Sequence, residues 1–392
     1  MRRIYLDYNS TTPVLPEAVQ AMVECCARLP GNPASQHRSG REAHRVLEDA
    51  REAIAEMLGA RLTGRHAERL VFTSGGTESN NLAVLGLARA AAPEAPREIV
   101  ISAIEHPSVE GPAAELERAG WTVHRLAVST DGVVRADQID ALLARRPALV
   151  SVMLASNETG VLQPIAELAV RCRAAGVPIH TDAAQVVGKR PVDFRALGVD
   201  AMTVAAHKFH GPRGIGALVL RHDAAISPLL FGGVQQGGAR PGTESVALAV
   251  GMRLALEASQ RDADRAGRVL KLRDRFEAAL RAGYPGLVVN GVHAERLPHV
   301  SNVAFPGLDR QALFVALDLA GVECSTGSAC ASGSSEPSPV LRAMACDEAV
   351  VGSSLRFSLG FTTPVEDVDE AAERILAVCE RMAAPASAAR AR

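Results

Sequence analysis

Hydrophobic and polar positions follow two periods along the first two thirds of the chain. Short apolar runs that end at polar residues predict strands, and longer stretches with an apolar residue every three or four positions predict helices. The predicted strands are residues 69–73, 98–103, 122–126, 149–154, 177–181, 201–205 and 216–220. The predicted helices are residues 17–29, 39–58, 78–92, 109–119, 136–145 and 165–175.

This order of elements favours an α/β fold with a mostly parallel, seven-stranded sheet flanked by helices. After Gly251, a long amphipathic stretch to Ala282 predicts one helix that leads into a second region of strands and helices. We therefore expect a large domain over residues 15–255. Residues 1–14 and 256–392 are expected to form a smaller α+β domain.

Composition and charge exclude several classes of protein. The chain has 392 residues, of which 47% are hydrophobic and 22% charged, as in an ordinary globular protein. A net charge of -2 gives no electrostatic footprint for nucleic acid or an anionic membrane. The N-terminus lacks the features of a signal peptide, and no apolar run approaches the ~20 residues that span a bilayer. We expect a cytoplasmic protein with neither nucleic acid nor membrane as a partner.

The seven cysteines form no CxxC pair and no His/Cys cluster at zinc-ligand spacing. The sequence therefore predicts neither a disulfide framework nor a metal site, and most of the cysteines are expected to be small apolar fillers. Lysine is rare in this chain, which has only Lys189, Lys208 and Lys271. A lysine in a motif is informative here, because arginine cannot lose a proton and attack a carbonyl carbon.

Lys208 follows the predicted strand 201–205 and precedes a glycine-rich turn. The end of a strand in a cationic, partly desolvated pocket can give a Schiff-base lysine its lowered pKa and its rigid aim. A solvated loop lysine is the alternative. Asp182 likewise follows a predicted strand, where open α/β sheets bind ligands, and a protonated pyridine nitrogen would offset its burial. A helix cap is the alternative for Asp182.

Two further stretches carry candidate chemistry. Residues 73–81, TSGGTESNN, join a predicted strand to a predicted helix, and glycines there let backbone N–H groups approach a phosphate. A capped turn without a ligand fits that stretch equally well, since it lacks the P-loop lysine and the GxGxxG pattern. Residues 324–335, CSTGSACASGSS, are small and offer little to pack, which suits a reactive thiolate at Cys330. A lone cysteine in such a loop is often incidental.

Taken together, the motifs resemble one family over essentially the whole chain. The matching stretches run in order from YLDYNSTTP at residue 5 through GNPASQHRSGREA, FTSGGTESNNLA, EHPSV, NETGVLQPI, HTDAAQVVGK, AHKFHGPRGIG, RPGTES and STGSACASG to SLRFSLG at residue 354. The chain resembles the cysteine desulfurases of the NifS/IscS family, within the aspartate-aminotransferase-like fold of pyridoxal-phosphate enzymes. The resemblance implies conversion of L-cysteine to L-alanine, with the sulfur passed to an acceptor protein for iron–sulfur cluster or other thio-cofactor assembly.

The resemblance also implies roles for individual residues. The catalytic residues would be Cys330, which would carry the sulfur as a persulfide, Lys208 and His106. Lys208 would bind pyridoxal 5'-phosphate covalently, Asp182 would pair with the pyridinium nitrogen and Gln185 would hydrogen-bond the phenolic oxygen. The remaining cofactor-binding residues would be Gly76, Thr77, His106, Asn157, His207 and, from the partner subunit of a homodimer, Thr243.

Asn157 and Arg356 would bind the substrate carboxylate, the latter as a bidentate fork. Two positions depart from the family pattern: Ala205 replaces a serine, which removes one phosphate donor, and Ser156 replaces the first of two asparagines. The alternatives are a selenocysteine lyase or another pyridoxal-phosphate enzyme of the same fold, and a sulfur carrier without catalytic activity.

Overall fold

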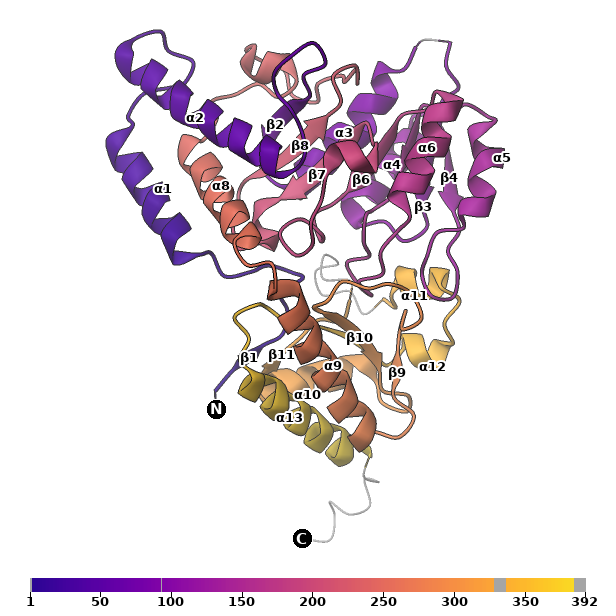
Figure 1. Cartoon of the computed structure of the whole chain (residues 1–392). Helices are drawn as coiled ribbons and strands as arrows, with labels where there is room; N and C mark the ends of the chain where they lie inside the picture. Colours follow the sequence, from indigo (N-terminus) through magenta and orange to yellow (C-terminus); the bar gives the residue numbers. More distant parts are fainter. Residues whose placement is uncertain (1, 93, 328–335, 384–392) are drawn as a thin grey trace.

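The computed structural model describes residues 2–92, 94–327 and 336–383. Figure 1 shows a wide upper body, formed by the middle of the chain, and a narrower lower body, formed by the N-terminal strand and the C-terminal third. The upper body is built on a seven-stranded sheet with the order β2-β8-β7-β6-β5-β3-β4. Its strands are β2 (Arg69–Thr73), β3 (Glu98–Ser102), β4 (Thr122–Leu126), β5 (Leu149–Ser151), β6 (Ile179–Asp182), β7 (Ala201–Ala205) and β8 (Gly216–Leu220).

The sheet confirms the predicted fold class. Strands β4, β3, β5, β6 and β7 run parallel to one another, whereas β8 runs antiparallel to both β2 and β7. Since β8 is reversed, its first residue, Gly216, pairs with the last residues of β2 and β7, Thr73 and Ala205. The carboxyl ends of β2 and β7 therefore lie at the same edge of the sheet as those of β5 and β6.

Alternate residues of each strand are buried on opposite faces of the sheet, as the pleat requires. On one face, Val71 and Leu218 pack with helices α3 (Gly76–Ala90) and α4 (Pro107–Arg118). On the other face, Phe72 and Val219 belong to a larger core. That core includes residues of α2 (Arg38–Met57), α6 (Ile165–Ala175), α7 (Phe194–Leu197) and α8 (Val246–Gln260).

The other elements of the upper body are short or lie outside these two layers. They are α1 (Pro16–Arg28), which packs against α8 (Figure 1), η1 (Ala136–Gln138), α5 (Ile139–Leu143), η2 (Ala206–Lys208) and η3 (Gln235–Gly238). The helix predicted over residues 136–145 is a single 3-10 turn followed by the short α5. The strand predicted over residues 149–154 ends at Ser151, although Val152 and Leu154 still donate hydrogen bonds to the neighbouring strand.

The lower body is an α+β arrangement with its own core. Strands β12 (Ser354–Ser358), β10 (Val300–Ala304) and β9 (Val288–Val289) form an antiparallel sheet, and β1 (Ile4–Tyr5) pairs in parallel with β11 (Val322–Glu323). The helices are α9 (Arg265–Gly283), α10 (Arg310–Leu319), α11 (Pro339–Ala343), α12 (Glu348–Val351) and α13 (Val365–Ala383). Ile4 and Leu6, from the N-terminus, are fully buried in the same core as Phe276 and Phe357.

The single helix predicted from Gly251 to Ala282 is wrong, because the chain breaks between α8 and α9. At the break, the Asp262 carboxylate accepts a hydrogen bond from Arg268 Nη1 at 3.1 Å. Residues 261–265, RDADR, offer no large apolar side chain to bury, and aspartate side chains compete with the helix for backbone hydrogen bonds. The domain boundary at residues 255/256 stays a prediction.

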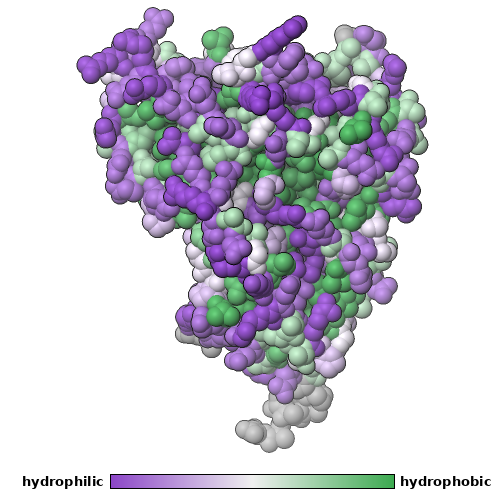
Figure 2. Space-filling view, in the orientation of Figure 1, coloured by the Kyte–Doolittle hydropathy of each residue, from purple (hydrophilic) through white to green (hydrophobic). Residues whose placement is uncertain are grey.

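Figure 2 shows one face of the molecule, on which hydrophilic residues prevail and hydrophobic residues appear between them in small groups. Over the described residues, no helix combines the length and the apolar character needed to cross a membrane.

The edge of the sheet at Gly216 generates a stability prediction. A Cβ atom at Gly216 would lie 2.7 Å from the carbonyl carbon of Gly75 and from the carbonyl oxygen of Val204, both of which are backbone. Gly216→Ala should therefore lower the free energy of unfolding by about 1–3 kcal/mol, as overpacking does. Urea unfolding measures this change.

Gly267→Ala is the matched control. A Cβ atom at Gly267, in α9, would meet no atom within 4 Å, so alanine there should stabilise the protein by about 0.5–1 kcal/mol. Equal stability of the two variants would contradict the close approach at Gly216.

Candidate active site

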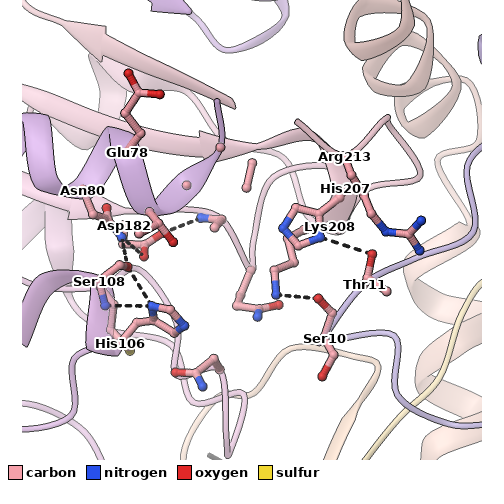
Figure 3. Close-up of a pocket in the computed structure, with 18 of the residues that line it drawn as sticks. Ser10, Thr11, Glu78, Asn80, His106, Ser108, Asp182, His207, Lys208 and Arg213 are labelled. Carbon is pink, nitrogen blue, oxygen red and sulfur yellow. Dashed lines mark hydrogen bonds between the residues drawn. The ribbon is translucent and has the colours of Figure 1, made fainter. Parts of the chain in front are cut away.

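A cavity of about 460 Å³ lies at the carboxyl ends of β5, β6 and β7. The structure brings eight of the predicted site residues together around it: Gly76, Thr77, His106, Asn157, Asp182, Gln185, His207 and Lys208. Ser10 and Thr11, from the N-terminal segment, complete one wall. Figure 3 shows Lys208 and His207 on one side of the cavity and Asp182, Asn80, Ser108 and His106 on the other.

The N-terminus of α3 opens on this cavity. Gly76 and Thr77 are the first two residues of that 15-residue helix, and the first N–H groups of a helix have no acceptor within it. A Cβ atom at Gly76 would lie only 3.3 Å from the Cβ atom of Ala205, so the glycine permits the helix to sit close to β7. Free N–H groups and the helix dipole together favour an anion at this end of the cavity.

Asp182 is held by two donors at the end of β6. Asn80 Nδ2 donates to Asp182 Oδ2 at 2.7 Å, and the N–H of Ala184 donates to Asp182 Oδ1 at 2.9 Å. Asn80 Nδ2 also donates to Ser108 Oγ at 2.8 Å. The carboxylate is therefore fixed in orientation beside the cavity, where it can accept a further donor. Sequence reasoning missed Asn80, although it lies in the stretch TESNN.

The same network reaches His106. The N–H of Ser108 donates to His106 Nδ1 at 3.1 Å, and Ser108 Oγ lies 2.7 Å from that nitrogen. Because Nδ1 accepts the N–H, the ring proton of the neutral imidazole is assigned to Nε2. Burial lowers the pKa of His106, Lys208 and Arg356 lower it further, and Asp182 partly offsets these effects. The ring is therefore neutral near pH 7.

Lys208 lies in the turn that follows β7. Its Nζ donates to the carbonyl oxygen of Asn9 at 2.5 Å and to that of Ser10 at 3.0 Å. The neighbouring ring nitrogen His207 Nδ1 lies 3.2 Å from Thr11 Oγ1. Burial, and then the charge of Lys208, lower the pKa of His207 to about 4, so this ring is also neutral.

Asn9, which sequence reasoning missed, is fully buried and links these groups. Its backbone N–H donates to Ser358 Oγ at 2.9 Å, and its carbonyl oxygen accepts a hydrogen bond from Gln185 Nε2 at 3.1 Å as well as that of Lys208. Its side-chain Nδ2 donates to the carbonyl oxygen of Asn157 at 3.1 Å, and His299 Nε2 lies 2.7 Å from its Oδ1. Asn9 thereby connects both bodies of the molecule at the cavity wall.

Arg356 lies beside the first cavity, on a second one of about 920 Å³ that also reaches His106, Asn157 and Lys208. Only 1% of the residue is exposed. Its Nη2 donates to Asp7 Oδ1 at 2.7 Å and to Ser10 Oγ at 2.8 Å, and its Nη1 donates to the carbonyl oxygen of Asn157 at 3.0 Å. A carboxylate ligand would therefore compete with Asp7, a residue that the sequence did not single out.

The other two predicted site residues are Cys330 and Thr243. Cys330 lies outside the described residues. Thr243 is exposed on the segment before α8 and does not line the cavity of its own chain. The prediction that Thr243 serves a partner subunit stays a prediction.

The three buried cysteines among the described residues differ from a reactive thiol. Burial raises the pKa of Cys172 and of Cys379 to about 12 and also raises that of Cys324. These thiols stay protonated at neutral pH, as small apolar fillers do. Within the described ranges, no group of histidine, cysteine, aspartate and glutamate side chains could hold a metal ion.

The comparisons with known proteins agree with this geometry. The family model described as aminotransferase class-V matches residues 4–371. An IscS-like cysteine desulfurase of Mycobacterium tuberculosis is 45% identical over 94% of this chain and 94% of its own length. The structure of a NifS-like protein from Rickettsia africae has a TM-score of 0.87 and 32% identity, covering 97% of this chain and 100% of that one. A structure titled SspA in complex with cysteine has a TM-score of 0.79 and 32% identity, covering 91% and 98%.

Glu105, which directly precedes His106, generates a prediction about pH. Ser102 Oγ and the N–H of Met153 both donate to Glu105 Oε1, whereas Oε2 is buried without a hydrogen-bond partner among the described residues. Burial raises the pKa of Glu105 from its ordinary 4.5 to about 8. A carboxyl group whose pKa is higher in the folded state stabilises the protein fully at low pH, and this contribution is lost as the pH rises to about 8.

Glu105→Gln removes this titration, since glutamine stays neutral. The free energy of unfolding of the variant should therefore rise relative to that of the wild type between about pH 5 and about pH 8.5. Urea unfolding of both proteins at several pH values measures the difference. Parallel pH profiles would show that Glu105 does not carry a raised pKa.

Proposed function

The chain belongs to the class-V aminotransferase family, among its cysteine desulfurases, and on that premise we propose how its residues take the sulfur from L-cysteine and release L-alanine. The observation that carries the proposal is a single cavity with Lys208 on one side and Asp182 on the other, lined also by the N-terminus of α3. An amine, a carboxylate and an anion site can together bind a phosphorylated aromatic aldehyde, which can then react with an amino acid.

We infer that pyridoxal 5'-phosphate binds in this cavity, because each of its polar groups has a counterpart there. The N-terminus of α3 with Gly76, Thr77 and His207 suits the phosphate, and Asp182 suits a protonated ring nitrogen. Lys208 supplies the amine for the covalent bond. When bound, the cofactor supplies an electron sink for the bonds of the substrate. Ala205 has no hydroxyl group to donate to the phosphate, so the other donors must supply all of its hydrogen bonds.

Lys208 is the base in this proposal. When its amine is not bonded to the cofactor, the carbonyl oxygens of Asn9 and Ser10 hold it in the cavity wall, where it can take the Cα proton of the substrate. His106 can stack on the cofactor ring and exchange a proton through Nε2, since Ser108 occupies Nδ1. Each residue thus acts from a position that hydrogen bonds fix.

Cys330 is the acceptor of the sulfur. Its thiolate would attack the sulfur of the bound cysteine, so that an S–S bond forms and the Cβ–S bond breaks. The bonding electrons stay with the three-carbon fragment, which leaves as alanine after protonation. Arg356 and Asn157 would hold the carboxylate of the substrate, with Arg356 exchanging Asp7 for the ligand.

We also propose a homodimer and a sulfur-acceptor protein as partners. Thr243 is exposed on a segment that carries two exposed hydrophobic residues, Phe231 and Val234, each 88% exposed. Exposed apolar residues in one segment are typical of an interface, so a second copy of the chain can cover them and receive Thr243. The cytoplasmic location stays a prediction.

The first experiment is a coupled assay on the purified protein. The protein should be yellow, and L-cysteine with a reductant should give sulfide and alanine in equal amounts. A yellow protein that forms neither product would contradict the proposed reaction but would still support the proposed cofactor. A protein that stays colourless with added pyridoxal 5'-phosphate would contradict the cofactor. A much faster reaction with selenocysteine would favour the selenocysteine lyase.

Cys330→Ala separates sulfur transfer from cofactor binding. The variant should keep the yellow colour and the spectral response to L-cysteine, because Lys208 and Asp182 are unchanged. It should form no enzyme-bound persulfide. Its release of sulfide should be at least about 100-fold slower, as expected for the loss of a nucleophile. Mass spectrometry of the intact protein detects the added sulfur. Cys346→Ala, at a partly buried cysteine outside the two cavities, is the control and should behave as the wild type. Normal sulfide release by Cys330→Ala would refute the role of Cys330.

A further inference from the structure

Lys189 is a lysine near the cavity that the proposed reaction does not use. It lies in the turn after β6, four residues after Gln185, and its Nζ donates to Gln185 Oε1 at 3.0 Å. Gln185 in turn lines the cavity beside Asp182 and Lys208. Lys189 therefore contacts a cavity residue while it is absent from the cavity lining itself.

The two ends of the Gln185 amide are held by different partners. Oε1 accepts from Lys189, and Nε2 donates to the carbonyl oxygen of Asn9 at 3.1 Å. The reversed amide would set its oxygen against the carbonyl oxygen of Asn9, with two acceptors facing each other, and would lose the hydrogen bond that Lys189 donates to Oε1. Because an amide nitrogen has two N–H groups, one N–H of Gln185 is left for a ligand in the cavity.

The surroundings of Lys189 lower the pKa of its amine. Burial has the largest effect on its pKa, and the nearby cations Lys208, Arg356 and Arg265 all act in the same direction, so the pKa of Lys189 is well below its ordinary range. The imidazoles in its surroundings are His207, His210 and His299, and burial lowers the pKa of each. Lys189 therefore donates to Gln185 from a buried position among other basic groups, with a pKa below its ordinary range.

The backbone of the turn keeps this amine in place. The N–H of Lys189 donates to the carbonyl oxygen of Val186 at 3.0 Å. The preceding residue, Gly188, has a φ of +76°, and a Cβ atom there would lie 2.3 Å from the Cβ atom of Phe209. Only glycine lets the turn approach the residue that follows Lys208 so closely. The spacing between the two lysine-bearing segments is thus set by packing.

We propose that Lys189 is a positioning residue, which fixes the amide of Gln185 so that an N–H group faces the phenolic oxygen of bound pyridoxal 5'-phosphate. This role rests on the proposed cofactor. It assigns a function to a residue that takes no part in the proposed reaction. The N–H stabilises the oxygen in its ionised form, and so it lowers the pH at which the bound cofactor changes colour.

The test is a pH titration of the visible absorption of the holoenzyme in the absence of substrate. In Lys189→Met, the amide can rotate, and the midpoint of the colour change should rise by roughly one pH unit, the equivalent of one hydrogen bond to a charged acceptor. Lys271→Met is the matched control, because Lys271 is exposed on α9, and its midpoint should equal that of the wild type. Lys189→Leu replaces Lys189→Met if the latter does not fold.

A double-mutant cycle shows whether Lys189 acts through Gln185. In a Gln185→Ala background, Lys189→Met should cause no further shift of the midpoint, because the amide that it orients is gone. An unchanged midpoint in the single variant, or an equal shift in both backgrounds, would overturn the proposal.

Borohydride reduction and peptide mapping complete the test. Lys208 should carry the label in the wild type and in Lys189→Met, and a label on Lys189 in the wild type would overturn its positioning role. A wild type that binds no cofactor would contradict the proposed function instead, so the two failures are distinguishable.

Discussion

The hydrogen bonds of Asn9 hold the site in one piece. This fully buried residue lies just after the N-terminal strand of the lower body, yet its carbonyl oxygen accepts from Lys208 and Gln185 of the upper body. Its side chain joins Asn157 to His299. A buried polar group without a partner costs free energy, so each of these groups depends on the others for its place. The positions of the Lys208 amine, the Gln185 amide and Asn157 are therefore coupled through one residue.

The basic groups around the cavity are placed in a way that suits anions. The amine of Lys208 and the buried guanidinium of Arg356 meet at this place, while burial keeps His106 and His207 neutral. Asp7 pairs with Arg356, and Asp182 lies on the side of the cavity opposite Lys208. The neutral imidazoles limit the repulsion among these basic groups.

The pattern of apolar and polar residues predicted the strands of the sheet well. It did not predict contacts between residues that lie far apart in the sequence. The strands at Arg69–Thr73, Thr122–Leu126, Ala201–Ala205 and Gly216–Leu220 have the predicted bounds, because each is a short apolar run with a polar or glycine boundary. The prediction of one long helix failed at residues 261–265, since apolar periodicity says little about a short polar stretch with two aspartates. Lys208 and Asp182 were found because each follows a strand. Asn9, Asn80 and Asp7 were missed, because their roles consist of hydrogen bonds to segments far away in the sequence.

The reversed direction of β8 sets a limit on how the chain can vary. If β8 ran parallel to β7, the segment between them would cross back over the sheet and could lengthen on the outer surface without harm. Instead, residues 206–215 leave β7 and enter β8 at the same edge, so both ends of the segment that bears Lys208 are fixed by paired strands. An insertion or deletion in this segment would move the reactive amine itself. Descendants of this sequence should therefore change in length elsewhere, in the crossover connections, and keep this segment at a constant number of residues.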